Sequence, residues 1–138
     1  MNIDSILNGV VIDHIEAGKG MEIYHLMGLD ELDSSVAIIK NASSKKMGKK
    51  DVIKIAASFP VNMDILGYVD PGVTVSVIRN GEIVEKKKMA LPEKLTNVIF
   101  CKNPRCITSS EQELPHVFRL TDEENKVYRC VYCETKAN

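Results

Sequence analysis

CKNPRC (101–106) and CVYC (130–133) contain all four cysteines of this chain. The two close pairs are separated by residues 107–129. Each short loop can present two thiolates to one cation, and this is the spacing of a tetrahedral four-thiolate zinc site. The segment between the pairs is polar, and segments below about 40 residues usually need a metal, a disulfide or a partner to fold. The pattern therefore predicts a small, β-rich, zinc-ribbon-like C-terminal domain.

Two other uses of four cysteines remain open. Two disulfides fit an even cysteine count, and an iron–sulfur centre also takes four thiolates. Residues 1–12 show neither a basic start nor a long apolar run, so the sequence gives no export signal that would favour disulfides and indicates a cytoplasmic protein. Four thiolates leave no open coordination position, so we expect a structural and not a catalytic zinc.

Composition limits the classes of function. The chain has 138 residues, a formal net charge of −1 and 27% charged residues. Its length allows one ordinary domain, or one small domain with a metal module. The balanced charge disfavours a surface that binds nucleic acid throughout, and the absence of tryptophan disfavours a base-stacking platform. No apolar run approaches the ~18 residues of a membrane-spanning helix.

The residues before the cysteines alternate between strand and helix patterns. We expect strands at 10–15 and 35–40, helices at 21–29 and 62–68, a polar loop at 41–48, and a hairpin of strands 73–79 and 82–89. Residues 49–58 fit either one helical face or two alternating strand faces, and their β-branched content favours a strand. Asn80-Gly81 is the preferred pair for a two-residue type I′ turn. This order predicts an α+β fold, with a ferredoxin-like antiparallel sheet and two helices in residues 1–92 and the metal domain in 93–138.

Lysines form two groups in the first domain, at positions 45, 46, 49, 50 and 54 and at 86–88. If both groups lie on one sheet, they could form a phosphate-binding patch. The alternative is that they protect exposed strand edges. Side chains alternate along a strand, so Asp13 and His14 are expected on opposite faces. The residues alone thus indicate a cytoplasmic α+β domain joined to a metal module, and leave anion binding open.

Four stretches in order resemble a known family: residues 9–15, 47–55 and 91–93, and the spacing C-x4-C-x23-C-x2-C. The series is similar to the regulatory chain of aspartate carbamoyltransferase, over essentially the whole length. The resemblance implies a non-catalytic chain that binds CTP, ATP or UTP, with or without Mg²⁺, and so controls pyrimidine biosynthesis. It implies regulatory homodimers that bridge catalytic trimers into a dodecamer of two trimers and three dimers. It also implies one structural zinc, held by Cys101, Cys106, Cys130 and Cys133.

The resemblance also implies a nucleotide site in the first domain. Its positions match Ile3, Ser5, Ile6, Val11, Asp13, His14, Lys50, Lys54, Ser76, Ile78, Ile83 and Lys86. Asp13 would accept hydrogen bonds from the ribose, His14 and Lys50 would face the phosphates, and Lys54 and Lys86 would reach phosphate or ribose and base. At Ser76 and Gly81 the family's well-known members carry asparagine and tyrosine.

In the zinc domain, Asn103 and Glu134 match positions that contact the catalytic chain, whereas Arg105 and Thr135 differ from the family. The competing hypothesis is a zinc-ribbon protein that binds nucleic acid, which the lysine groups and the metal module would suit. The balanced charge and the few aromatic residues count against it.

Overall fold

The computed structural model describes residues 6–137. The chain forms two compact units, Met1–Ala90 and Leu91–Asn138. The first contains β1 (Gly9–Glu16), α1 (Gly20–Leu26), a 3-10 turn η1 (Leu29–Glu31), β2 (Val36–Ser44), β3 (Gly48–Ile55), α2 (Met63–Val69), β4 (Thr74–Arg79) and β5 (Glu82–Lys88). The second contains β6 (Lys94–Thr96), α3 (Ile107–Ser110), β7 (Val117–Asp122) and β8 (Val127–Cys130).

The five strands of the first unit form one antiparallel sheet in the order β2-β3-β1-β4-β5. Its first four strands and two helices have the ferredoxin-like order, and β5 extends the sheet beyond β4 as the second arm of a hairpin. The second unit carries a sheet of three strands in the order β6-β7-β8. The predicted α+β fold class is confirmed.

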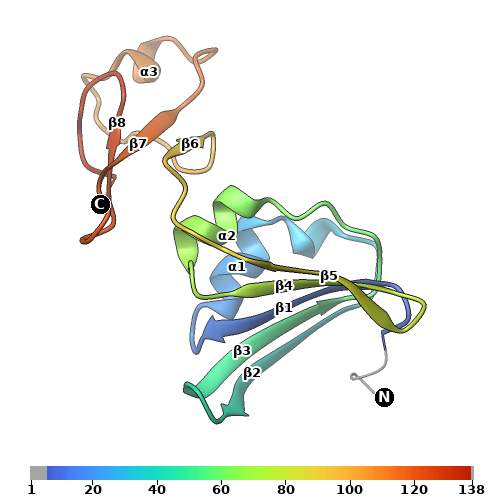
Figure 1. Ribbon diagram of the computed structural model, residues 1–138. Coiled ribbons are helices and arrows are strands. Elements are labelled where there is room, and N and C mark those ends of the chain that lie inside the picture. The colour runs from blue at the N-terminus through green and yellow to red at the C-terminus, as the bar shows by residue number, and fades with distance from the viewer. Residues whose placement is uncertain (1–5, 138) are drawn as a thin grey trace. The chain divides into compact units, whose positions relative to one another are not determined.

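Figure 1 shows α1 and α2 on one side of the five-stranded sheet. The core lies between the sheet and these two helices. It consists of side chains with at most 9% exposure: Val10, Ile12, Ile15, Ile23, Leu29, Ile53, Ile55, Ile65, Leu66, Val69, Val73 and Val75. Each such side chain contributes about 1.5–3 kcal/mol when fully buried. We call the side of the sheet turned away from α1 and α2 the open face, since the described residues of the first unit place no helix over it.

The pairing register of the sheet shifts at three places: once between β4 and β5, at Val77 and Ile78, and at two β-bulges beside β3. The register of β1 against β3 shifts between Ile12 and Ile15, and that of β2 against β3 shifts between Ile39 and Ala42. Ile12 and Ile15 are both fully buried, although residues three positions apart on a regular strand would point to opposite faces of the sheet. The residues between them, Asp13 and His14, therefore both lie on the open face. The prediction that they point to opposite faces is wrong, because a bulge breaks the two-residue alternation.

Several local predictions are confirmed. Asn62 caps α2, since its side-chain oxygen accepts the backbone N–H groups of Asp64 and Ile65 at 3.0 and 3.2 Å. Asn80 and Gly81 have φ values of 52° and 79°, as a type I′ turn requires. Residues 49–58 also contain a strand, β3, and not a helix.

Other elements differ from expectation. The predicted polar loop at 41–48 is strand as far as Ser44, because β2 continues its ladder with β3 up to the pair Ser44 and Gly48. The helix expected at 21–29 ends at Leu26, and Gly28 turns the chain with φ 68°. The short strand β6 was not anticipated, and its Leu95 is buried opposite Phe118.

Candidate functional site

A row of side chains crosses four strands of the open face. Lys54 of β3 stands opposite Val11 of β1, which stands opposite Ser76 of β4. Ser76 in turn stands opposite Lys86 of β5. Because adjacent strands lie about 4.8 Å apart, the two lysines are attached about 14 Å apart, with the smaller side chains between them. The row therefore places two ammonium groups at the ends of a shallow, uncharged strip.

Beside this row, the bulge in β1 assembles a polar group. Lys50 Nζ lies 2.9 Å from Asp13 Oδ1, and the same carboxylate oxygen accepts the backbone N–H of His14 at 2.6 Å. The ring Nδ1 of His14 lies 2.9 Å from Thr74 Oγ1. Burial raises the pKa of Asp13, but the hydrogen bonds from Lys50 and from the His14 backbone outweigh it and hold the pKa below its ordinary value of 3.8. Asp13 is thus an ionised acceptor at neutral pH.

The other end of the open face is apolar. Ile78 of β4 pairs with Ile83 of β5, and Ile83 is 60% exposed. The hairpin tip is fastened to the segment before β1, because Gly81 N donates to Leu7 O at 2.9 Å. The Ile6 side chain in that segment lies against Gly9. This end therefore offers apolar contact next to backbone polar groups.

Nearly all the residues that the resemblance assigns to nucleotide fall on or beside the open face. Those on it are Val11, Asp13, His14, Lys50, Lys54, Ser76, Ile78, Ile83 and Lys86. Ile6 precedes β1, and Ile3 and Ser5 lie outside the described residues. Sequence reasoning missed Thr74 and Lys88, which are paired on the same face. Only the register of the sheet could have found them.

The two lysine groups meet in part on the open face. Lys50 and Lys54 of the first group share it with Lys86 and Lys88 of the second, whereas Lys87 pairs with Glu85 at 3.2 Å away from it. Lys45 and Lys46 stand in the turn between β2 and β3. A compact group of lysines on one face suits a small anion better than a long polyanion.

The four cysteines converge in the second unit. Their sulfur atoms all lie within 4.8 Å of one another. The Sγ atoms of Cys101 and Cys133 are 3.6 Å apart, and those of Cys106 and Cys130 are 3.7 Å apart. A tetrahedral centre with metal–sulfur bonds of about 2.3 Å has edges of about 3.8 Å. The cluster therefore fits one metal ion with four thiolate ligands and no open position.

Two threonine hydroxyls contact this cysteine cluster. Thr108 Oγ1 donates to Cys106 Sγ at 3.1 Å and lowers the pKa of that thiol. Thr135 Oγ1 lies 3.2 Å from Cys133 Sγ and accepts a hydrogen bond from Asn103 Nδ2 at 3.0 Å. Burial would raise the pKa of Cys133, but the hydrogen bonds from Thr135 lower it to about 6.

The pKa values of the other two thiols, Cys101 and Cys130, are raised. Burial raises the pKa of Cys101 to about 12 and also raises that of Cys130. A metal must therefore displace protons from these thiols, while the hydroxyl contacts favour the charged form of the other pair.

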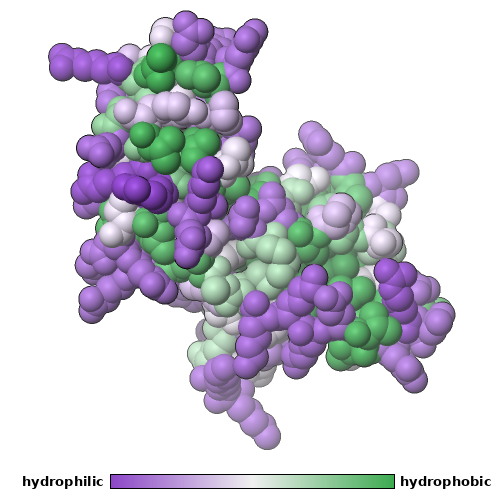
Figure 2. All heavy atoms as spheres, turned by 45° about the horizontal axis from the view of Figure 1, so that its top comes forward, coloured by the Kyte–Doolittle hydropathy of each residue, from purple (hydrophilic) through white to green (hydrophobic). Residues whose placement is uncertain are grey.

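Exposed groups surround the cysteine cluster. Large apolar side chains there are 40–59% exposed: Phe100, Ile107, Val131 and Tyr132. Of the expected partner contacts, Glu134 is exposed and Asn103 is half-buried. A cavity of about 430 Å³ lies beside them, lined by Phe100, Cys101, Lys102, Asn103, Phe118, Thr135, Lys136 and Ala137. Figure 2 shows patches of apolar residues on the otherwise largely hydrophilic surface of both units. Such patches commonly mark interaction sites.

Among the described residues, no helix is long and apolar enough to cross a membrane.

Comparison with known proteins covers both units. Residues 1–90 match the family described as aspartate carbamoyltransferase regulatory chain, allosteric domain. Residues 93–138 match the family described as aspartate carbamoyltransferase regulatory chain, metal binding domain. The chain is 53% identical to the aspartate carbamoyltransferase regulatory chain of Clostridium botulinum, over 97% of its own length and 92% of the relative's.

More distant relatives agree. The identity is 47% to the regulatory chain of Clostridium tetani, over 97% of this chain and 94% of the relative, and 42% to that of Bifidobacterium longum, over 99% of both. The chain therefore belongs to the family of aspartate carbamoyltransferase regulatory chains, and its role is regulatory and not catalytic.

Proposed function

We propose that the first domain, residues 1–92, binds a nucleoside triphosphate (CTP, ATP or UTP) on the open face, and that the second, residues 93–138, docks a zinc-stabilised surface on the catalytic chain. The observation that carries the proposal is the shared face of Lys50, Lys54 and Lys86 around Asp13 and His14. The holoenzyme would control the first committed step of pyrimidine biosynthesis.

The charges on the open face suit a triphosphate. A nucleoside triphosphate carries about four negative charges, and clustered lysines with charge-assisted hydrogen bonds can neutralise it without a glycine-rich loop. Lys50 and Lys54 belong to the same side of β3, and Lys86 stands three strands away. Phosphates near β3 and a nucleoside extending toward β5 would use the whole strip. Mg²⁺ could accompany the phosphates.

The nucleoside would find acceptors and apolar contacts. Asp13 is an acceptor held ionised by its neighbours, so it can bind ribose hydroxyls. Ile78, Ile83 and Ile6, with the more N-terminal Ile3 and Ser5, would surround the base. Ser76 has a small side chain and Gly81 has none, so recognition of the base would depend more on backbone groups and less on side-chain contacts than in relatives with larger residues there.

The cysteine cluster would hold zinc and act at a distance from any chemistry. Cys101, Cys106, Cys130 and Cys133 bring two loops together, and these loops carry Asn103 and Glu134. Structural zinc contributes apparent binding energy on the order of 10–16 kcal/mol to small modules. Regulatory homodimers would bridge two catalytic trimers in a dodecamer with three dimers, in the cytoplasm. Effector binding would bias this assembly by a coupling of about 1–3 kcal/mol.

Calorimetric titration of the zinc-loaded chain with CTP, ATP and UTP, with and without Mg²⁺, tests the nucleotide site. Lys54→Ala should weaken triphosphate binding about tenfold or more, because a hydrogen bond to a charged group contributes about 1.5–3 kcal/mol. Lys46→Ala removes an equal charge from the turn outside the open face and should leave the affinity within about twofold. An equal loss of affinity in both variants would mean that net positive charge, and not the position of Lys54 on the open face, determines binding. A wild-type chain that binds none of the three nucleotides would contradict the proposal.

Sedimentation with the catalytic trimer tests docking. The zinc-loaded chain should form a particle of two trimers and three dimers, and a thiol-reactive mercurial should dissociate it. Carbamoyltransferase activity of that particle should respond to added CTP and ATP. A particle that survives mercurial treatment would remove zinc from the docking role.

A further inference from the structure

We infer that Asp51 is a positioning residue for the open face: by fixing the β2 bulge and the turn after β1, it maintains the β1 bulge that brings Asp13 and His14 to the same side of the sheet. The inference rests on the proposed nucleotide site, which uses those two side chains. Asp51 itself lies on the opposite, helix-covered face and is fully buried, with 0% exposure. It therefore cannot touch a ligand on the open face and must act through the backbone.

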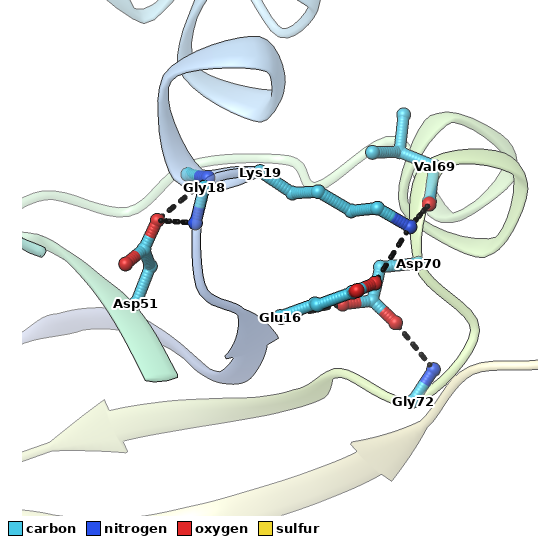
Figure 3. A network of polar contacts seen from close by, with 8 residues as sticks. Glu16, Gly18, Lys19, Asp51, Val69, Asp70 and Gly72 are labelled. Atoms are coloured by element: carbon cyan, nitrogen blue, oxygen red, sulfur yellow. Dashed lines mark hydrogen bonds and ion pairs between the residues drawn. The ribbon is translucent and has the colours of Figure 1, made fainter. Parts of the chain in front are cut away.

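The Asp51 carboxylate is saturated with backbone donors. Its Oδ2 accepts the N–H groups of Gly18 and Gly20 at 3.1 and 3.0 Å, and its Oδ1 accepts the N–H of Asn41 at 3.0 Å. Figure 3 shows the carboxylate aimed at the turn between β1 and α1. Burial raises the pKa of Asp51, but these three backbone hydrogen bonds outweigh it and keep the pKa below 3.8. A buried charge in the core is thus balanced by three fixed dipoles.

The two bulges face the same stretch of β3. The β1 bulge lies opposite the β3 segment between Ile53 and Asp51. The β2 bulge lies opposite the overlapping β3 segment between Val52 and Lys50. Each bulge contains a residue in the left-handed region, His14 with φ 60° and Asn41 with φ 57°. Such conformations persist only where surrounding contacts hold them.

A bulge frees a backbone N–H from its ladder, and a buried N–H needs another acceptor. At the β2 bulge that acceptor is Asp51, which takes the N–H of Asn41. At the β1 bulge the N–H of His14 goes to Asp13, and Asp51 holds the turn that follows β1 through Gly18 and Gly20. One carboxylate therefore fixes the bulge on one side of β3 and the exit of the bulged strand on the other.

The close fit at Gly20 supports this role. A Cβ atom at Gly20 would lie 2.8 Å from Asp51 Oδ2, and Gly18 has φ 102°, which glycine adopts without strain. The turn is therefore built around the carboxylate. If β1 were a regular strand, Asp13 and His14 would point to opposite faces and one of them would enter the core. The bulge instead delivers Asp13 to Lys50 and His14 to Thr74.

Asp70 provides a matched comparison. It is also nearly buried, with 8% exposure, and accepts two backbone N–H groups, from Glu16 at 2.7 Å and Gly72 at 3.0 Å. Figure 3 shows it beside the same strand end, near the ion pair of Glu16 and Lys19. It ties β1 to the turn before β4 but accepts from neither bulge. Loss of Asp70 should therefore destabilise the unit without moving Asp13 or His14.

The experiment compares Asp51→Asn with Asp70→Asn in the full-length, zinc-loaded chain. Asparagine keeps the shape but turns an NH₂ group toward a backbone donor. We measure CTP and ATP affinity by calorimetry and the ring ¹⁵N shifts of His14 in histidine-labelled protein, assigned with His14→Ala. We expect Asp51→Asn to weaken nucleotide binding about tenfold or more and to shift the His14 ring signal. Asp70→Asn should lower the melting temperature similarly but leave affinity within about threefold and the ring signal in place.

Wild-type affinity together with an unmoved His14 signal in Asp51→Asn would overturn the inference, as would equal loss of binding in the two variants. If Asp51→Asn does not fold, Gly20→Ala is the substitute, since it pushes the turn away from the carboxylate. It should shift the same ring signal. If the wild-type chain binds no nucleotide, the proposed function fails, whereas the His14 signal still decides whether Asp51 positions the bulge.

Discussion

The two units of the chain reach stability in different ways. The first buries a continuous set of aliphatic side chains between one sheet and two helices. The second, Leu91–Asn138, buries far fewer large apolar side chains, namely Leu95, Val117, Phe118 and Tyr128. Besides these side chains, the four cysteines of the second unit come together in one cluster. One unit is therefore held by its own core, and we expect the other, a small module with four converging cysteines, to need a metal to close its loops.

The largest effect should come from Cys130→Ala. Cys130 is buried, with 1% exposure, and loss of its thiolate leaves three ligands for a four-coordinate metal. We expect zinc loss, unfolding of the second unit and no binding to the catalytic chain, with nucleotide affinity close to wild type. Zinc content and two-dimensional NMR spectra check this. The control is Val131→Ala at the next, 45% exposed position, which should keep zinc; a Cys130→Ala chain with a folded second unit would contradict the comparison.

Leu66→Ala is the converse test. Leu66 of α2 has 0% exposure, and a leucine-to-alanine change in a core typically costs about 2–5 kcal/mol. The first unit should melt at lower temperature while the second keeps its zinc. Thermal unfolding followed by NMR, unit by unit, would show this. Leu26→Ala on α1, where leucine is 38% exposed, should have a clearly smaller effect. A parallel loss of zinc from Leu66→Ala would mean that the units do not fold independently.

A smaller effect is expected at the threonines beside the sulfur atoms. Thr108→Val removes a buried hydroxyl from Cys106, and outer-shell changes of this kind typically weaken metal affinity by about 10–100-fold. Zinc transfer to a colorimetric chelator should accelerate accordingly. Thr135→Val should act less on zinc, because Thr135 is exposed, but it also breaks the hydrogen bond with Asn103. It should therefore weaken catalytic-chain docking more than Thr108→Val does; the reverse order would separate Asn103 from the docking surface.

The smallest effect is a pH dependence of the first unit. The pKa of Asp51 is lowered in the folded chain from 3.8, so its contribution to stability is fully present above about pH 4. That contribution falls as the pH drops below 3.8 toward the folded pKa, where protonation removes the charge that three backbone donors stabilise. Asp51→Asn should flatten this part of the acid unfolding curve, measured by circular dichroism. A variant curve parallel to wild type would show that Asp51 contributes no acid sensitivity.

Local chemistry in the sequence predicted much of the structure. The Asn62 cap and the Asn80-Gly81 turn depend on residues a few positions apart, and the cysteine cluster depends on two short motifs; all three features appear as expected. The open-face residues came from resemblance to a family, and the sheet register shows that they share one side. The nucleic-acid hypothesis gives way to family membership.

What the sequence could not predict depends on distant contacts. The bulge at His14 breaks strand alternation, and Asp51, to which we assign a role in maintaining it, lies 37 positions further along the chain. The strand β6 has only three residues, Lys94–Thr96, and is too short to show a period. It is recognisable only because Leu95 meets Phe118.

The position of β1 in the sheet has a consequence for how the chain is made. β1 is the first strand in the described part of the chain, yet it lies at the centre of the sheet, between β3 and β4. One of its edges has no strand to pair with until β4, which ends at Arg79, has emerged. At translation rates of about 5–20 residues per second, this interval from Glu16 to Arg79 is about 3–13 s. We therefore expect the hydrophobic strand β1 to lack a pairing partner on that edge for several seconds, and the metal unit is synthesised only after the last strand of the first sheet.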